Sequence, residues 1–197
     1  MADLVLFDID GTLFDPRKFG VLYRAELIKI LGIEEDALSA AIADYYATLE
    51  TTTDFDPHGL AAYLASRFSV DKEKIDGAIW NKSHFKEAVF EDALPTVQAL
   101  SKSKTLGIFS QGFVEFQKYK LENTGLLKYF DPEQIFIHKR KADDTSLAAI
   151  PKDATVIEDK HDVAETLSSI CSVVWINRRT PDADPKLRTI HSLSELV

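Results

Sequence analysis

Leu4-Val5-Leu6-Phe7-Asp8-Ile9-Asp10-Gly11-Thr12 is the stretch that decides the fold of this chain. Its first four residues form a continuous apolar run, which is typical of a strand buried on both faces of a parallel sheet. Asp8 then lies at the carboxyl end of that strand, where open α/β sheets bind their ligands. The sequence therefore predicts an α/β fold with a functional site at the end of its first strand.

Asp8 and Asp10 are two residues apart, so their side chains would point the same way if the strand continued. Two ionised carboxylates at that separation repel each other. A bound cation can neutralise them, one of them can bind a proton, or the turn at Gly11 can separate them. Each of these three arrangements would make the end of the strand a place for chemistry.

Three later apolar runs also end in polar residues. Thr105–Phe109 leads into Ser110-Gln111-Gly112, Ile135–Ile137 into His138-Lys139-Arg140-Lys141, and Thr155–Ile157 into Glu158-Asp159. One such motif alone would be weak evidence, because short motifs often occur by chance. Four of them in order indicate that acidic, basic and hydroxyl groups far apart in the chain converge on one site.

In these motifs and their order the chain resembles the haloacid dehalogenase (HAD) superfamily, in the capped branch of phosphoglycolate phosphatases and β-phosphoglucomutases. The four family motifs are matched by Asp8-Ile9-Asp10-Gly11-Thr12, Ser110, Lys141 and Glu158-Asp159. The resemblance implies a three-layer α/β/α Rossmann-like core with a parallel sheet. It also implies a small α-helical bundle, the cap domain, inserted after the first strand.

The resemblance implies a role for each motif residue. The implied catalytic residues are Asp8 and Asp10, and the implied phosphate-binding residues are Thr12, Ser110, Gln111, Gly112 and Lys141. The implied cofactor is Mg²⁺, which prefers oxygen ligands. Its implied ligands are Asp8, the backbone carbonyl of Asp10, Glu158 and Asp159.

The chemistry of these residues suits phosphoryl transfer. A carboxylate such as Asp8 can attack phosphorus and form an aspartyl phosphate, which divides one difficult displacement into two easier ones. Asp10 can protonate the leaving alkoxide and later deprotonate water, a role worth about 10² to 10⁴ in rate. The resemblance implies that dehalogenases lack an acid at this position, because a halide leaves without a proton. The sequence therefore predicts a Mg²⁺-dependent phosphatase that acts on a small phosphomonoester.

Two other functions stay open at this stage. A phosphomutase would differ only in that a sugar hydroxyl, rather than water, takes the phosphoryl group. A catalytically weak metal-binding scaffold would contact a protein partner through the cap, but it has no need of the complete set of motif residues. The phosphate-binding lysine is open as well, because Ala142 rather than the usual Pro follows Lys141, and Lys139 lies two residues earlier.

The region after Phe14 changes from a strand pattern to helical periodicity, which continues to about Val89. Four helices are predicted there, with apolar stripes Phe19–Leu31, Leu38–Leu49, Leu60–Phe68 and Ile75–Trp80. Four amphipathic helices cannot bury their stripes alone, so we expect them to pack as a bundle. The predicted domains are a core of residues 1–14 and 91–197 and a cap of residues 15–90, with residues 92–95 as the return linker.

Composition limits the partners and the location. The formal net charge of −9 argues against nucleic acid or an acidic membrane surface, since both would repel the chain. The apolar runs fall far short of the roughly 20 residues that cross a bilayer, so a cytoplasmic location is expected. The single cysteine, Cys171, excludes an internal disulfide and is expected to be a core thiol. A monomer or a homodimer is expected.

Overall fold

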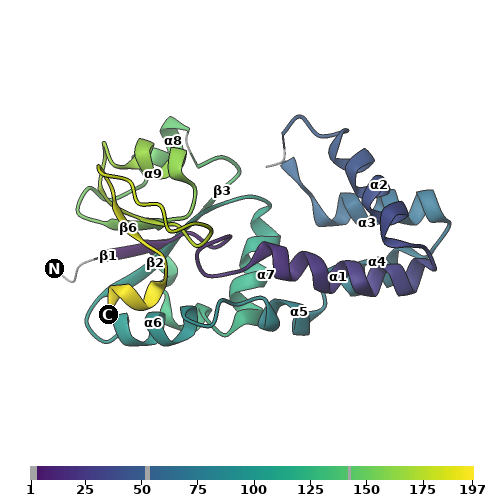
Figure 1. The fold of residues 1–197 in the computed structure, drawn as a ribbon, viewed down its shortest axis with the longest axis horizontal. Coiled ribbons are helices and arrows are strands. Elements are labelled where there is room, and N and C mark those ends of the chain that lie inside the picture. The colour runs from purple at the N-terminus through teal and green to yellow at the C-terminus, as the bar shows by residue number, and fades with distance from the viewer. Residues whose placement is uncertain (1–3, 52–53, 142) are drawn as a thin grey trace. The chain divides into compact units, whose positions relative to one another are not determined.

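The computed structural model describes residues 4–51, 54–141 and 143–197 of the chain (Figure 1). The chain divides into two compact units. The first consists of Met1–Asp15 and Val89–Val197, and the second of Pro16–Ala88. Among the described residues, no helix combines the length and the apolar character needed to span a membrane.

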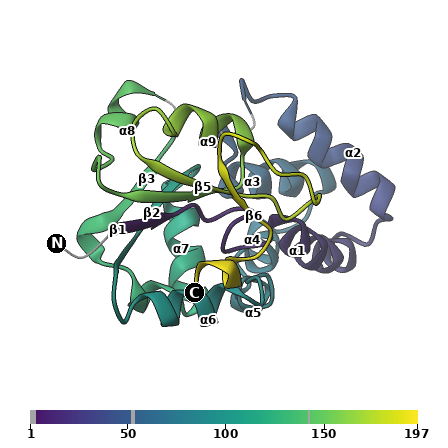
Figure 2. The ribbon, with the colours of Figure 1, turned by 60° about the vertical axis from the view of Figure 1, so that its left-hand side comes forward.

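A six-stranded sheet forms the centre of the first unit, and each pair of neighbouring strands is parallel (Figure 2). Its order is β3-β2-β1-β4-β5-β6. The strands are β1 (Leu4–Phe7), β2 (Thr105–Gln111), β3 (Ile135–His138), β4 (Thr155–Glu158), β5 (Ser172–Ile176) and β6 (Arg188–Ile190). Because β1 lies between β2 and β4, both of its edges are paired. Helices cover both faces of the sheet, so β1 is buried, which explains its wholly apolar sequence.

Helices cover both faces of this sheet. Figure 1 shows α6 (Ala93–Leu100) and α7 (Val114–Thr124) on one side and α8 (Asp144–Ala148) and α9 (His161–Leu167) on the other. This arrangement follows from right-handed crossovers between parallel strands, because the chain changes direction along the sheet after β3. The predicted three-layer α/β/α core with a parallel sheet is confirmed. Short 3₁₀ helices are also present in this unit, and they span Leu127–Tyr129, Pro132–Gln134 and Leu193–Leu196.

One cluster of buried side chains joins the sheet to the helices. It contains Leu6, Phe109 and Val156 from three adjacent strands and Leu167 from α9. The thiol of Cys171 packs against this cluster and is partly buried, and burial raises its pKa. Cys171 is therefore a packing residue, as the sequence predicts.

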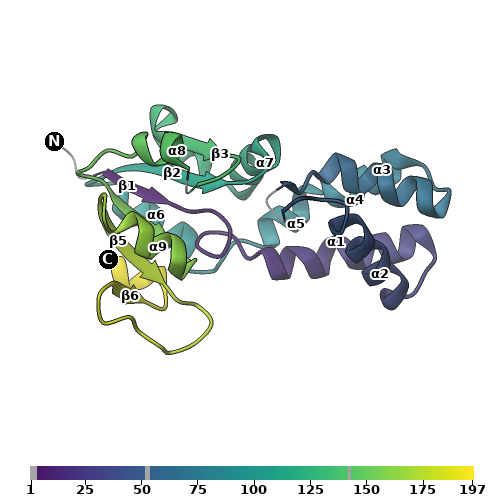
Figure 3. The same cartoon turned by 90° about the horizontal axis from the view of Figure 1, so that it is seen from above.

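The described residues of the second unit form helices joined by loops, and no strand (Figure 3). Its helices are α1 (Pro16–Leu31), α2 (Glu35–Tyr46), α3 (Pro57–Phe68), α4 (Lys72–Ile79) and α5 (Lys82–Glu87). The α3 helix begins as predicted, with Asp56 as N-cap accepting a hydrogen bond from the backbone N–H of His58 and Pro57 in the first helical position. The prediction of four helices is wrong, because within the described residues Asn81 caps a fifth, short helix that buries Phe85.

The two chain segments that flank this helical unit lie side by side within the first unit. Phe14 and Val89 form an antiparallel bridge, and the backbone N–H of Phe90 donates to the carbonyl of Leu13 at 3.1 Å. The return linker is shorter than expected, because α6 begins at Ala93. Pro95 lies in the first turn of that helix, where a missing N–H costs nothing.

Candidate active site

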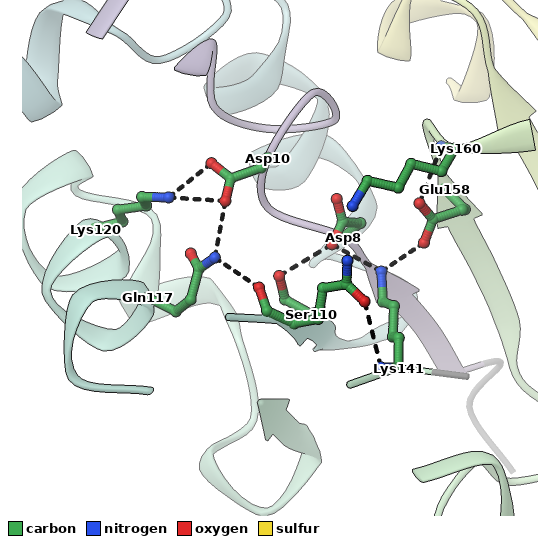
Figure 4. Close-up of polar contacts among 9 residues, drawn as sticks. Asp8, Asp10, Ser110, Gln117, Lys120, Lys141, Glu158 and Lys160 are labelled. Atoms are coloured by element: carbon green, nitrogen blue, oxygen red, sulfur yellow. Dashed lines mark hydrogen bonds and ion pairs between the residues drawn. The ribbon is translucent and has the colours of Figure 1, made fainter. Parts of the chain in front are cut away.

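The motif residues come together at the carboxyl edge of the sheet (Figure 4). Asp8 follows β1, Ser110 lies near the end of β2, Lys141 follows β3, and Glu158 ends β4. The hydroxyl of Ser110 donates to Asp8 Oδ1 at 3.0 Å, and Lys141 Nζ donates to the same oxygen at 2.7 Å. Lys141 Nζ also donates to Glu158 Oε2 at 2.5 Å. Residues up to 133 positions apart are thereby joined in one hydrogen-bonded group.

Lys141 is a buried cation at the centre of this group, with 2% of its surface exposed. Burial by itself would lower the pKa of the ammonium, but the charges and hydrogen bonds of Asp8 and Glu158 outweigh it and raise that pKa. The side chain is therefore charged at neutral pH. Lys139, the other candidate for the phosphate-binding lysine, is exposed.

Three carboxylates form an acidic cluster beside Lys141. Asp8, Glu158 and Asp159 each place one oxygen within 4.8 Å of the others. Burial, followed by the charges of Asp8 and Glu158, raises the pKa of Asp159 to about 8. Asp159 Oδ1 is buried and accepts no hydrogen bond from the described residues. Oxygen donors with excess negative charge and an unsatisfied buried oxygen fit a hard cation such as Mg²⁺.

Gly11 allows Asp159 to approach the first loop. Its φ of +88° lies in the left-handed region that favours glycine. A Cβ placed on Gly11 would lie only 2.2 Å from Asp159 Oδ2 and 2.5 Å from its Cγ. The turn after β1 therefore needs glycine for its backbone conformation and also for the space that Asp159 occupies.

Asp10 has its own set of partners, away from the acidic cluster. Lys120 Nζ lies 2.7 Å from Oδ1 and 2.8 Å from Oδ2 of Asp10, and Gln117 Nε2 donates to Oδ2 at 2.8 Å. Figure 4 shows Asp10 turned toward these two side chains and Asp8 turned toward Lys141. The repulsion expected between Asp8 and Asp10 is thus avoided by the turn and by a separate lysine for each.

The other residues expected to bind phosphate are Gln111, Gly112 and Thr12. Gln111 accepts a hydrogen bond from the backbone N–H of Lys141 through its side chain at 3.3 Å, while the Gly112 N–H donates to the carbonyl of His138 at 2.9 Å. The hydroxyl of Thr12 is buried and makes no hydrogen bond within the described part of the chain. The N–H of Gly112 is therefore used within the loop, and no hydrogen bond joins the Thr12 hydroxyl to Asp8. Phosphate binding by these residues stays a prediction.

Gln117 and Lys120 are the site residues that the sequence analysis missed. They are three positions apart on α7, so they lie on the same face of that helix. This helix directly follows the Ser110 motif, and the spacing was the available signal. Polar residues at that spacing are common on exposed helix faces, so the pattern alone does not distinguish a buried pair.

A family model, haloacid dehalogenase-like hydrolase, matches residues 2–148 of the chain. The chain belongs to this family. The match confirms the predicted superfamily and the predicted enzyme class, a HAD-like hydrolase. Pyrimidine 5'-nucleotidase YjjG of Escherichia coli (strain K12) is 27% identical over 216 residues, covering 98% of this chain and 96% of that protein.

Solved structures show the same fold at low identity. A haloacid dehalogenase-like hydrolase from Burkholderia xenovorans LB400 has a TM-score of 0.74 at 20% identity, covering 100% of this chain and 95% of that one. The HAD-hydrolase YfnB from Bacillus subtilis, whose structure is bound to magnesium, has a TM-score of 0.65 at 17% identity, covering 99% and 96%. At these identities the likeness of this HAD-like hydrolase to them concerns the fold.

Proposed function

We propose that this HAD-like hydrolase is a Mg²⁺-dependent phosphatase that hydrolyses small phosphomonoesters, with Asp8 as the residue that is transiently phosphorylated. The observation that supports this most is the surroundings of Asp8. One of its oxygens is held by Lys141 and Ser110, and two further carboxylates lie beside it. A nucleophile with a fixed orientation, a cation and a set of metal ligands is what phosphoryl transfer requires.

The first step of the proposed reaction joins Asp8 to the substrate. A carboxylate oxygen of Asp8 attacks phosphorus, the bond between phosphorus and the ester oxygen breaks, and Asp10 gives a proton to the departing alkoxide. Lys141 has three N–H donors and uses two for Asp8 and Glu158, so its third can bind a phosphoryl oxygen. Ser110 has one proton and donates it to Asp8, so we assign Ser110 mainly to orienting the nucleophile.

Asp8, Asp159, Glu158 and the backbone carbonyl of Asp10 are the groups that we propose hold Mg²⁺. The ion supplies positive charge that offsets the repulsion between the Asp8 carboxylate and the phosphate. In the second step Asp10 takes a proton from water, the water oxygen attacks phosphorus, and the bond to Asp8 breaks. Inorganic phosphate and the free Asp8 carboxylate are the products, and Asp10 again carries the proton.

The difference in exposure between the two aspartates agrees with these roles. The side chain of Asp8 is 6% exposed and that of Asp10 is 32% exposed. Asp8 is thus shielded from competing water, as a nucleophile must be. Asp10 is exposed enough to reach an ester oxygen or a water molecule. A dehalogenase would have no use for this second acid, so its presence favours phosphate esters over haloacids.

The substrate panel can be chosen from the name of a similar protein. Because the similar Escherichia coli protein is named a pyrimidine 5'-nucleotidase, pyrimidine nucleoside 5'-monophosphates come first, followed by purine nucleotides and sugar phosphates. The experiment compares phosphate release by the parent, by Asp8→Asn and by Asp162→Asn, each with Mg²⁺ and with a chelator. Asp162 is an exposed acid in the first turn of α9 and serves as the matched control.

We expect the parent and Asp162→Asn to release phosphate only with Mg²⁺, and Asp8→Asn to release none under either condition. Turnover in the chelator, or an Asp8→Asn variant as active as the parent, would contradict the proposal. Mg²⁺ binding without turnover of any ester would instead favour the scaffold function.

A further inference from the structure

Gln117 and Lys120 hold the Asp10 carboxylate by three contacts, and we call these two residues the Asp10 clamp. Lys120 contacts both oxygens and Gln117 contacts one of them, with all three distances between 2.7 and 2.8 Å. Gln117 is 3% exposed and Lys120 is 5% exposed, so water competes little for these hydrogen bonds.

The clamp residues are themselves fixed in position. Lys120 Nζ lies 5.0 Å from the ring centroids of both Phe14 and Phe116, a cation–π geometry that holds the ammonium between two aromatic faces. Gln117 Nε2 also donates to the carbonyl of Gln111 at 2.8 Å. The amide is therefore anchored to the loop after β2, and the ammonium to the segment that follows Asp10.

The acidic cluster explains why the Asp10 side chain needs to be held by the clamp. Asp8, Glu158 and Asp159 would all bind the same ion, and Asp10, which is two residues from Asp8, is near enough in sequence to join them. An Asp10 side chain attracted to the ion could not transfer protons to an ester oxygen. A misplacement of about 1 Å in a reacting group can lower a rate about 10²-fold.

We propose that Gln117 and Lys120 are positioning residues, which keep the Asp10 carboxylate away from the metal ligands and oriented for proton transfer. This inference rests on the proposed function, because it assigns a purpose to the acid and base of that reaction. Neither residue belongs to the four motifs that relate the chain to its family. The clamp acts through Asp10, so its contribution should depend on how much the substrate needs a proton.

The experiment varies the leaving group. An alkyl phosphate must have its leaving oxygen protonated, whereas 4-nitrophenyl phosphate releases a stable anion that needs little help. We compare kcat/KM for both esters, with Mg²⁺, in the parent and in Lys120→Met, Gln117→Met and Lys118→Met. Methionine is unbranched, is close to each side chain in length and removes the hydrogen bonds. Lys118 is exposed on the same helix, so Lys118→Met is the matched control for loss of a lysine charge.

We expect Lys120→Met to lower kcat/KM about 10²-fold for the alkyl phosphate and less than about threefold for 4-nitrophenyl phosphate. Gln117→Met, which loses one of the three contacts and no charge, should show the same preference to a smaller degree. If circular dichroism shows that Lys120→Met does not fold, Gln117→Met still tests the inference. Lys118→Met should behave as the parent with both esters.

A double-mutant cycle tests whether the clamp acts through Asp10. In an Asp10→Asn background, Lys120→Met or Gln117→Met should cause no further loss with the alkyl phosphate. Equal losses for both esters, or a full additional loss in the Asp10→Asn background, would overturn the inference while leaving the proposed function intact. A parent without Mg²⁺-dependent turnover of either ester would overturn both.

Discussion

Replacement of Gly11 by alanine should disrupt the proposed metal site while the rest of the fold stays in place. The added Cβ would lie 2.2 Å from Asp159 Oδ2, so the carboxylate has to retreat by about 1.2 Å to reach 3.4 Å, where ordinary contact begins. Metal ligands tolerate departures of only about 0.2 Å from their preferred distances. We therefore expect Mg²⁺ affinity to fall at least about 10- to 100-fold, the range found when a ligand loses its support.

The same substitution also strains the backbone, and a second glycine measures that effect alone. Gly11 has a φ of +88° and Gly125 a φ of +77°, but a Cβ on Gly125 would meet no atom within 4 Å. A left-handed conformation costs about 1–2 kcal/mol for alanine, which corresponds to a fall in Tm of about 2–8 °C in a chain of this size. Without metal, Gly125→Ala should show that fall, and Gly11→Ala should show at least that fall.

Calorimetric titration with Mg²⁺ then distinguishes the two variants. Gly125→Ala should bind Mg²⁺ with the affinity of the parent, and Gly11→Ala should bind it weakly or not at all. The activity of Gly11→Ala should fall in parallel. An unchanged Mg²⁺ affinity in Gly11→Ala would show that Asp159 does not bind the ion from this position, and the reasoning from the collision would be refuted.

Three further changes have defined outcomes. Mg²⁺ at 100 times its Kd should stabilise the parent by about 2.7 kcal/mol and raise its Tm by about 5–11 °C in calorimetric scans. Asp159→Asn should have a higher Tm than the parent without metal, and Mg²⁺ should not change that Tm. A rise in Tm with Mg²⁺ like that of the parent would contradict the metal site. Arg178→Ala removes an ion pair with Asp92 at 2.8 Å and should cost about 2–4 kcal/mol in urea unfolding. Burial raises the pKa of Asp92, but hydrogen bonds led by that of Arg178 outweigh burial and lower it. The stability that this pair contributes is therefore present above pH 3.8 and is lost as the pH falls further. Below pH 3.8 the variant should lose less stability than the parent, and equal losses would count against the pair. Gly107→Ala would place a Cβ 2.4 Å from the backbone oxygen of Gln134 and should destabilise the sheet by more than about 2 kcal/mol, so an unchanged urea midpoint would rule out that close packing.

The strands of the core were predictable because burial on both faces leaves an unbroken apolar run. β1 and the apolar parts of β2 and β4 were identified on that basis. β6 was not, because Arg188-Thr189-Ile190 is short and partly polar and lies at the edge of the sheet. The α5 helix was missed for a related reason, since six residues span less than two turns and show no periodicity.

The site was predictable only as far as its residues belong to strand ends. Asp8, Glu158 and Asp159 follow apolar runs, and topology brings such ends together. The partners of Asp10 do not follow this rule, because Gln117 and Lys120 lie 107 and 110 positions away on a helix. Sequence adjacency does not decide the role of Thr12, whose hydroxyl is buried and makes no hydrogen bond within the described residues.

The central claim is that Asp8 carries the phosphoryl group during turnover, and a quenched reaction tests it most directly. The parent is mixed with Mg²⁺ and a phosphomonoester that it hydrolyses, stopped with acid after less than one turnover, digested and analysed by mass spectrometry. The account predicts one phosphoryl group on the peptide that contains Asp8, and none on that peptide from Asp8→Asn. Phosphate release with no label on Asp8, or with the label on another residue, would contradict it.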